Sequence, residues 1–390
     1  MLKKTILAAV AAAAMLGGAA VQAADPVKIG MVTTLSGPGG YLGEDVRDAF
    51  LLAIEQEGGK LGGVPVELLV EDDALKPDQG KQIAAKMLRS DRTRIMTGII
   101  FSNVAGAVVP DILAAGAVYI SPNAGPSGFS GKGCNKNYFV ASWQNDNLHE
   151  AAGELAKQAG YKNLYIFAPN YQAGRDALAG FKRQYGGGLV GESYVQLNQT
   201  DFAAEIAQIR AAKPDAVYNF LPGGMGINFL KQWAASGLQG EIPLVLPAPS
   251  SDTRILNAIG DSTVGIISAS HWSEQLDNPA NKAFVAAFQK KYNRMPTEYA
   301  AQGYDTALLL AAALKSAGGD DPAKVAAGLK AAPATVKLTR GAFEWGKNQH
   351  PVQDWYSRMA EKGPDGKITN KVTGKILSMH ADAFAQDCAL

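Results

Sequence analysis

The 390-residue chain is poor in cysteine, in histidine and in unbalanced charge: it has two cysteines, four histidines and a formal net charge of +1. Two cysteines are too few for a disulfide-based scaffold or a four-cysteine zinc site. The near-zero net charge excludes a strongly basic nucleic-acid-binding protein. A hydrophobic content of 47% excludes intrinsic disorder. The length predicts two to three domains, because a single core stops growing at roughly 250–300 residues.

The chain also lacks the motifs of cofactor and catalytic sites. The glycine loop Gly37–Leu42 has leucine where the third glycine of a dinucleotide-binding loop belongs, and no P-loop is present. Gly125–Gly128 is one residue short of a hydrolase nucleophile elbow, and His149-Glu150 lacks the second histidine of a zinc-protease motif. We therefore expect no enzymatic activity, no cofactor and no metal. We interpret each of the scattered histidines as a surface or capping residue: His149, His271, His350 and His380.

The first residues have the pattern of a targeting segment. Lys3 and Lys4 precede the apolar run Thr5–Ala20, and Val21-Gln22-Ala23 supplies small residues for a cleavage site. The sequence predicts a signal peptide over residues 1–23 that is removed on export to a periplasm. The alternative is a membrane anchor, which is disfavoured because the run is shorter than the roughly 20 apolar residues of a membrane span.

The predicted export gives the two cysteines a role. An oxidising compartment favours a disulfide between Cys134 and Cys388, which would tie the C-terminal tail to the body of the protein. The alternative is a pair of free thiols. We predict the disulfide because it uses both cysteines and leaves no thiol exposed.

The mature chain alternates between strand and helix patterns. A buried strand pattern over Val27–Thr34 is followed by helical spacing over Glu44–Glu57. The alternation restarts with the strand pattern Leu164–Ala168, so two α/β units of similar size lie before and after about residue 142. Three helical stretches then follow, at residues 279–292, 299–316 and 322–330. This order predicts an α/β fold with mostly parallel sheets covered by helices on both faces.

Four loops rich in polar and small residues follow predicted strands, at residues 36–41, 100–103, 121–125 and 168–171. Open α/β sheets bind ligands at the carboxyl ends of their strands, so we expect these loops to meet in one cleft. Ser102 and Asn103 lie where a helix should begin, and the N–H groups and dipole of a helix start attract an anion. The alternative is that these residues only cap helices.

Five further stretches form a recognisable set: Ile29–Pro38, Glu71–Pro77, Thr200–Phe202, Lys213–Val217 and, most specifically, Tyr299–Ala307. With them the chain resembles the periplasmic solute-binding proteins of the branched-chain amino-acid (hydrophobic amino acid/amide) ABC transporters, the leucine-binding-protein family. The resemblance spans the whole mature chain.

The resemblance implies a type I periplasmic-binding fold, with two doubly wound, three-layer lobes joined by three hinge crossings. We expect the N-terminal lobe over residues 24–142 plus 274–352 and the C-terminal lobe over residues 143–273 plus 353–390. The resemblance also implies a monomer without a cofactor, which binds a small molecule in the cleft and delivers it to an ABC permease in the inner membrane.

The resemblance further assigns roles to single residues. Ser102 matches the family serine that binds the ligand carboxylate, Tyr171 matches the aromatic residue that closes over it, and Ser121 begins a loop whose main chain contacts the ligand. The complete set of expected ligand-binding residues is Tyr41, Phe101, Ser102, Asn103, Ser121, Pro122, Asn123, Tyr171, Pro222 and Ala248.

Two positions depart from the family pattern. Leucine-binding members have threonine at the position of Gly125 and, near Ala248, a glutamate that pairs with the ligand's ammonium group. Burial of an ammonium group without a charged partner is energetically costly. The site that binds the ammonium group is therefore lost in this chain, unless Asp252 or Glu274 takes the place of the missing glutamate. We therefore expect a small aromatic carboxylate of the benzoate or cinnamate type. Candidate aromatic walls are Tyr41, Phe101, Trp143, Tyr171 and Trp272.

The sequence thus predicts the periplasmic substrate-binding component of an ABC importer, which closes on its ligand by a hinge motion. One alternative is a binder of branched-chain amino acids or amides. Another is a ligand-sensing receptor domain of the same fold, which would need an anchor or a fused signalling domain. An exported hydrolase would need a nucleophile and a base at a suitable spacing, and we find no such pair.

Overall fold

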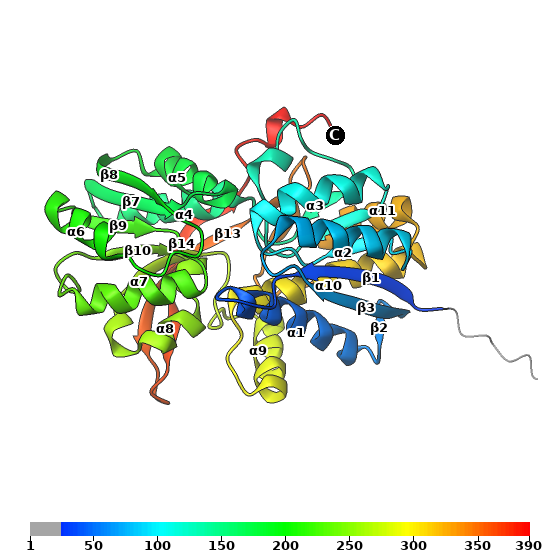
Figure 1. Cartoon of the computed structure of the whole chain (residues 1–390). Coiled ribbons are helices and arrows are strands. Elements are labelled where there is room, and N and C mark those ends of the chain that lie inside the picture. Colours follow the sequence, from blue (N-terminus) through cyan, green and yellow to red (C-terminus); the bar gives the residue numbers. More distant parts are fainter. Residues whose placement is uncertain (1–24) are drawn as a thin grey trace, which may run out of the picture.

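The computed structural model describes residues 25–390 and divides them into two α/β lobes that stand side by side (Figure 1). The predicted signal peptide, residues 1–23, lies outside the described residues. The first lobe, blue and cyan, is built from the beginning of the chain, and the second, green, from the middle (Figure 1). The predicted two-lobed α/β fold is confirmed.

The first lobe is built on a six-stranded sheet. Its strands are β1 (Val27–Thr33), β2 (Lys60–Leu61), β3 (Val64–Asp72), β4 (Ile95–Thr97), β5 (Val118–Ser121) and β6 (Tyr138–Val140). Their order is β2-β3-β1-β4-β5-β6, and all neighbours are parallel except β2 with β3. Ile29, Met31 and Val32 of β1 have no exposed surface, which is typical of a parallel strand covered on both faces.

Helices from two distant parts of the chain cover this sheet. They are α1 (Gly40–Gln56), α2 (Pro77–Arg89), α3 (Ser102–Ala114), α10 (Glu298–Ala317) and α11 (Pro322–Ala331). A further helix, α9 (Pro279–Tyr292), packs against α1, where Tyr292 Oη donates to the carbonyl oxygen of Asp48. α10 packs against α1 and α11. Gly303 of α10 permits the close approach, because a Cβ atom at this position would lie 2.3 Å from the carbonyl oxygen of Val46 in α1.

The second lobe is built on an eight-stranded sheet. Its strands are β7 (Asn163–Pro169), β8 (Gly188–Val195), β9 (Ala216–Asn219), β10 (Leu244–Pro247), β11 (Ile267–Ser270), β12 (Phe343–Trp345), β13 (Pro351–Lys362) and β14 (Ile368–His380). The order is β12-β13-β11-β10-β9-β7-β8, with β14 paired to β13. β7 to β11 are parallel to their neighbours in this group, whereas β13 is antiparallel to β11.

Five helices of the middle of the chain belong to this lobe: α4 (Asn145–Gln158), α5 (Gln172–Tyr185), α6 (Ala203–Ala212), α7 (Gly224–Ala235) and α8 (Thr253–Ile259). α4 packs against α5, β10 and β11. The start of α4 and the residues that follow β7, β9 and β10 lie on the side that faces the first lobe, because they line a cavity together with residues of that lobe.

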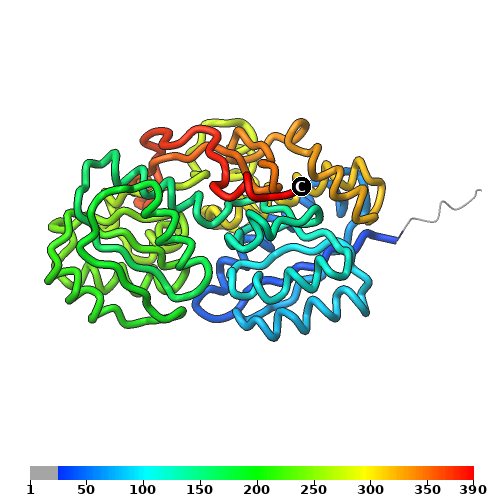
Figure 2. The backbone as a smooth tube through the Cα atoms, turned by 90° about the horizontal axis from the view of Figure 1, so that it is seen from above, coloured from blue at the N-terminus to red at the C-terminus, as the bar shows by residue number. Residues whose placement is uncertain are grey.

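The chain crosses between the lobes three times: from β6 to α4, from β11 to α9, and from α11 towards β13. The last part of the chain, orange to red, runs along one side of both lobes (Figure 2). β12 falls in the range predicted for the N-terminal lobe, yet it pairs with β13 of the second sheet. Trp345 of β12 also packs edge-on against Phe139 of β6, with ring centroids 5.5 Å apart. The strand contacts both lobes, and the boundary at residue 352 stays a prediction.

A buried ion pair holds two of these crossings together. Arg340 Nε lies 2.8 Å from Asp305 Oδ2 of α10, and both side chains are almost completely buried. Arg340 Nη1 donates to the carbonyl oxygens of Ala141 and Ser142, at 2.5 and 3.0 Å, in the crossing that leaves β6. It also donates to Gln353 Oε1 of β13, at 3.1 Å. One guanidinium therefore connects α10 to the first and third crossings.

The predicted disulfide between Cys134 and Cys388 is confirmed. It joins the loop that follows a short 3₁₀ helix, Ser127–Phe129, to the tail that follows another, Ala385–Asp387. The tail of the chain is thereby attached to the first lobe (Figure 2).

We expect the double variant Cys134→Ser/Cys388→Ser to lose about 2–5 kcal/mol of unfolding free energy, because the bridge restricts the unfolded chain. Urea denaturation monitored by tryptophan fluorescence measures this loss. Each single variant should lose a similar amount, since either change removes the bridge. Alkylation of both cysteines in unreduced, denatured protein would contradict the assignment.

Candidate ligand-binding site

A narrow cavity lies between the lobes, and the empty space in and around it, open solvent included, is about 370 Å³. The first lobe lines it with residues that follow β4 and β5, and the second lobe with residues that follow β7, β9 and β10. Both sheets therefore present the carboxyl ends of parallel strands to it. This is where open α/β sheets bind their ligands.

Five aromatic side chains line the cavity. They are Phe101, Trp143, Tyr171, Phe220 and Tyr299. The ring of Tyr171 is nearly parallel to that of Phe220, at a centroid distance of 6.4 Å and an interplanar angle of 16°. Phe101 of the first lobe lies across from Tyr171, also at 6.4 Å. Such walls favour a flat, apolar group that can stack or make edge-to-face contacts.

One end of the cavity is polar. Ser102 is the first residue of α3, and Phe101 occupies the N-cap position without a side-chain cap. Ser102 Oγ accepts a hydrogen bond from Asn145 Nδ2, at 3.1 Å, so its own hydrogen remains available to a ligand. Beside this hydroxyl, the first N–H groups of α3 are free to donate hydrogen bonds, and the positive end of the helix dipole attracts negative charge. The arrangement suits an anion such as a carboxylate.

Asn145 organises this polar end. Its Nδ2 also donates to Asp176 Oδ2 of α5, at 2.9 Å, and its Oδ1 accepts from the backbone N–H of Gly125, at 3.2 Å. A Cβ atom at Gly125 would lie only 2.1 Å from the carbonyl oxygen of Trp143. Threonine, which the leucine-binding members have at this position, would therefore clash with the backbone here.

No aspartate or glutamate lines the cavity within residues 25–390. Asp252, one possible replacement for the missing glutamate, accepts hydrogen bonds from Tyr41 Oη at 2.6 Å and from two backbone N–H groups of α8. Glu274, the other, accepts from the backbone N–H of Asn370 at 2.7 Å. Both carboxylates are engaged elsewhere, so neither provides the partner that a buried ammonium group needs.

Contacts between α1 and the second lobe hold the lobes together beside the cavity. Arg254 Nη1 of α8 lies 3.2 Å from Asp45 Oδ1 of α1, and the guanidinium covers the ring of Tyr41 at 4.6 Å from its centroid. Burial raises the pKa of Asp45 to about 6, although the charges of Arg294 and Arg254 oppose this shift. Across the cavity, Ser127 Oγ of the first lobe donates to Asp176 Oδ1, at 2.7 Å.

A family model described as periplasmic binding protein matches residues 26–365 of the chain. The chain belongs to the periplasmic binding protein family. Members of this kind are solute-binding proteins of ABC transporters and not enzymes, as we expected from the sequence. No helix in residues 25–390 combines the length and the apolar character needed to cross a bilayer. The same residues contain no group of three metal-binding side chains placed to hold an ion.

Three relatives illustrate the similarity. A Leu/Ile/Val-binding protein homologue of Brucella melitensis is 26% identical over 95% of this chain and 96% of its own length. A solute-binding protein of an ABC transporter from R. palustris, solved with benzoate, is 32% identical, with a TM-score of 0.87 over 94% of this chain and all (100%) of that one. A solute-binding protein from Rhodopseudomonas palustris BisB5, solved with 3,4-dihydroxybenzoic acid, is 30% identical, with a TM-score of 0.84 over 92% of this chain and 99% of that one.

The structure of this periplasmic binding protein brings half of the expected ligand-binding residues to the cavity. These are Phe101, Ser102, Asn123, Tyr171 and Pro222. Asn123 Nδ2 donates to the carbonyl oxygen of Ile100, at 2.7 Å, which leaves Asn123 Oδ1 buried without a partner among residues 25–390.

The other five expected residues lie outside the cavity. Tyr41 bonds Asp252 in the contact between the lobes, and Asn103 lines an adjoining hollow. Ser121 Oγ donates to the carbonyl oxygen of Ala124, at 2.7 Å. Pro122 and Ala248 are buried in the protein interior. Sequence position alone could not separate these residues from the lining ones, because neighbours in one loop point in different directions.

Sequence reasoning missed several lining residues, above all His149, Phe220 and Tyr299. The interpretation of the histidines as surface or capping residues was wrong: His149, His271 and His350 are at most 2% exposed. The stacking candidate Trp272 lies elsewhere, with its Nε1 donating to Asn281 Oδ1 at 2.7 Å. The helical register of α4 could have indicated His149, since it follows Asn145 by one turn.

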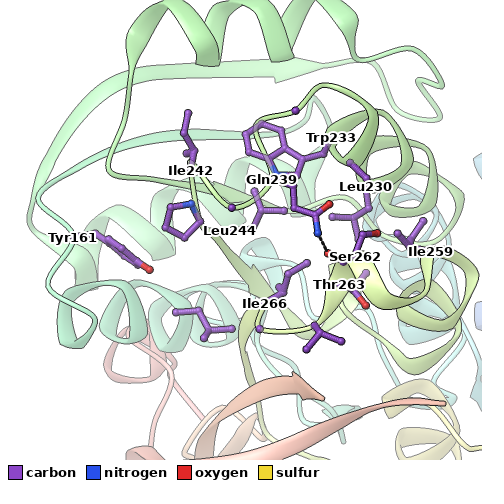
Figure 3. Close-up of a pocket in the computed structure, with 17 residues that line it drawn as sticks. Tyr161, Leu230, Trp233, Gln239, Ile242, Leu244, Ile259, Ser262, Thr263 and Ile266 are labelled. Carbon is purple, nitrogen blue, oxygen red and sulfur yellow. Dashed lines mark hydrogen bonds between the residues drawn. The ribbon is translucent and has the colours of Figure 1, made fainter. Parts of the chain in front are cut away.

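A wider hollow, of about 1150 Å³ with open solvent included, lies at the other ends of the strands of the second sheet (Figure 3). Trp233, Ile242 and Ile266 line it, and Gln239 reaches across to the carbonyl oxygen of Ser262 (Figure 3). It adjoins the amino ends of β10 and β11, whereas ligands of open α/β sheets bind at carboxyl ends. The candidate site is therefore the cavity between the lobes.

We expect Ser102→Ala to weaken binding of an aromatic carboxylate such as benzoate by about 1.5–3 kcal/mol, because it removes one charge-assisted hydrogen bond. Isothermal titration calorimetry measures the loss. The matched variant Ser121→Ala, whose hydroxyl bonds only within its own loop, should bind with nearly wild-type affinity. Unchanged affinity of Ser102→Ala would exclude this role for Ser102.

We expect Arg254→Gln to lower the affinity for the same ligand about twofold to fivefold, because a partly exposed ion pair contributes up to about 1 kcal/mol to the closed arrangement. Calorimetry measures the affinity, and small-angle scattering measures the fraction of closed protein. Lys282→Gln, which breaks an exposed pair with Asp277 away from the cavity, is the matched control. Equal affinities of the two variants would contradict the role of Arg254 in closure.

Proposed function

We propose that this solute-binding protein captures a small aromatic carboxylate, of the benzoate or cinnamate type, and delivers it to the permease of an ABC importer. It is exported through the signal peptide at residues 1–23 and acts in the periplasm as a monomer. The proposal rests on the combination of three features in one cavity. Five aromatic side chains line it, a helix start suited to an anion lies at one end, and no carboxylate of residues 25–390 lines it.

The chemistry of the cavity matches this ligand class at both ends. A carboxylate meets Ser102 Oγ and the first N–H groups of α3, where the helix dipole favours negative charge. An aromatic ring then packs against the aromatic side chains that line the rest of the cavity, among them Phe101 of the first lobe and Tyr171 of the second. Similar proteins solved with benzoate and with 3,4-dihydroxybenzoic acid support the same class.

Closure couples binding to transport. The ligand docks on the first lobe, proposed as residues 24–142 plus 274–352, and the second lobe, residues 143–273 plus 353–390, swings over it. Tyr171 then covers the ring, while the Arg254–Asp45 and Ser127–Asp176 contacts form between the lobes. The permease receives the closed, loaded protein.

A second candidate is a branched-chain amino acid or amide, since curated relatives are named as Leu/Ile/Val-binding protein homologues. Its ammonium group would need a buried acceptor. The unpartnered Asn123 Oδ1 is one such acceptor, but it carries no charge. Burial of an ammonium against a neutral oxygen alone is unfavourable, so we rank this class second. A ligand-sensing receptor domain would use the same cavity without a permease.

We expect aromatic carboxylates to stabilise the protein more than leucine, isoleucine or valine do. Ligand at roughly 100 times its Kd adds about 2.7 kcal/mol of stability, which shifts the melting temperature by a few degrees. A thermal-shift screen measures the effect, with benzamide as the control that keeps the ring but lacks the charge. Stabilisation by leucine without stabilisation by any aromatic acid would overturn the ligand class while leaving the transport role intact.

A further inference from the structure

One polar side chain that lines the cavity, His149, takes no part in the hydrogen bonds proposed for the ligand's carboxylate. His149 lies in α4, lines the cavity and is only 2% exposed. Its Nδ1 lies 2.5 Å from Tyr218 Oη, at the end of β9. Within residues 25–390 neither the imidazole nor the hydroxyl of Tyr218 makes another hydrogen bond. The nitrogen that remains for a ligand is Nε2.

The surroundings of Tyr218 decide which nitrogen of His149 carries the proton. Tyr218 is completely buried and stacks on Phe181, at a centroid distance of 4.0 Å. If Nδ1 were protonated, the Tyr218 hydroxyl hydrogen would be buried without an acceptor, which is costly. Tyr218 therefore donates to Nδ1, and Nε2 carries the hydrogen. Burial lowers the pKa of His149 to about 3, so the ring is neutral at neutral pH.

His149 lies one helical turn beyond the residue that organises the carboxylate end. His149 follows Asn145 by four residues, so both lie on one face of α4, about 6 Å apart along its axis. Asn145 is the residue that bonds Ser102. Phe220 lies edge-on to the imidazole, at a centroid distance of 4.9 Å, and continues the aromatic wall between the two ends. The two backbone positions are thus separated along the helix by about the span of a benzene ring.

We propose that His149 Nε2–H donates a hydrogen bond to a hydroxyl group on the far side of the ligand's ring, so that the protein selects hydroxybenzoates over benzoate. Tyr218 is the positioning residue that fixes the tautomer. This inference rests on the proposed function and narrows its ligand class. A ligand without the hydroxyl leaves the buried N–H unpaired, which is how a polar site rejects an analogue.

Calorimetry with benzoate, 3-hydroxybenzoate and 4-hydroxybenzoate tests the inference. The wild-type protein should bind the better hydroxybenzoate about tenfold more tightly than benzoate, the value of one hydrogen bond. His149→Phe should abolish this preference, so that benzoate and the hydroxybenzoates bind the variant with affinities within about twofold of one another. His149→Gln, whose side-chain amide still donates, should keep part of the preference. Circular dichroism confirms that each variant is folded at the assay temperature.

A second measurement distinguishes the effect of the His149 tautomer from the effect of how its ring packs. Nitrogen-15 NMR of the histidines should show His149 protonated at Nε2 and not at Nδ1, with a shift of Nε2 on addition of the hydroxybenzoate but a smaller one with benzoate. Tyr218→Phe should lower the preference for the hydroxyl group while the ring remains neutral. If His149→Phe does not fold, the NMR experiment and the ligand preference of Tyr218→Phe still test the inference.

Three outcomes would overturn the inference. An equal loss of affinity for benzoate and hydroxybenzoates in His149→Phe would place His149 at the carboxylate. An unchanged preference with unchanged affinities in that variant would show that His149 does not recognise the hydroxyl group. Absence of binding of every aromatic carboxylate to the wild-type protein would refute the proposed function itself, and the role of His149 with it.

Discussion

The connection between the two lobes depends on the buried ion pair of Arg340 and Asp305, because it joins two of the three crossings between them. The guanidinium connects α10 to the backbone of Ala141 and Ser142 and to Gln353 of β13. Removal of one partner from such a pair leaves an uncompensated buried charge, at a cost of about 3–5 kcal/mol. The guanidinium and its carbonyl acceptors therefore connect the first crossing to the third.

Ligand recognition and closure share residues at the mouth of the cavity. Asn145, at the start of α4, bonds Ser102 of the first lobe and Asp176 of the second. Asp176 in turn accepts from Ser127 of the first lobe. The carboxylate that we propose to bind at Ser102 would add to a network that already bridges the lobes. Binding energy gained there would favour the closed state, since a ligand shifts an equilibrium by its differential affinity for the two states.

Much of the fold could be predicted from local patterns. The helices expected at residues 279–292, 299–316 and 322–330 are found at Pro279–Tyr292, Glu298–Ala317 and Pro322–Ala331. Apolar periodicity and turn residues suffice for this, because they act over one or two turns of chain. The candidate site was only partly predictable. Ser102 and Tyr171 were found from the loops that follow strands, whereas Ala248 follows β10 and yet is buried in the core.

The sequence by itself determined the order of the elements, the cysteine pair and the loops that meet between the lobes. These features follow from hydrophobic spacing and composition, which are local. Only the tertiary structure decided which side chains of those loops line the cavity and which groups pair with each other. His149 illustrates the difference: its burial and its bond to Tyr218 join residues 69 positions apart. A contact of this kind depends on how α4 packs against the second sheet, and no spacing along the chain encodes it.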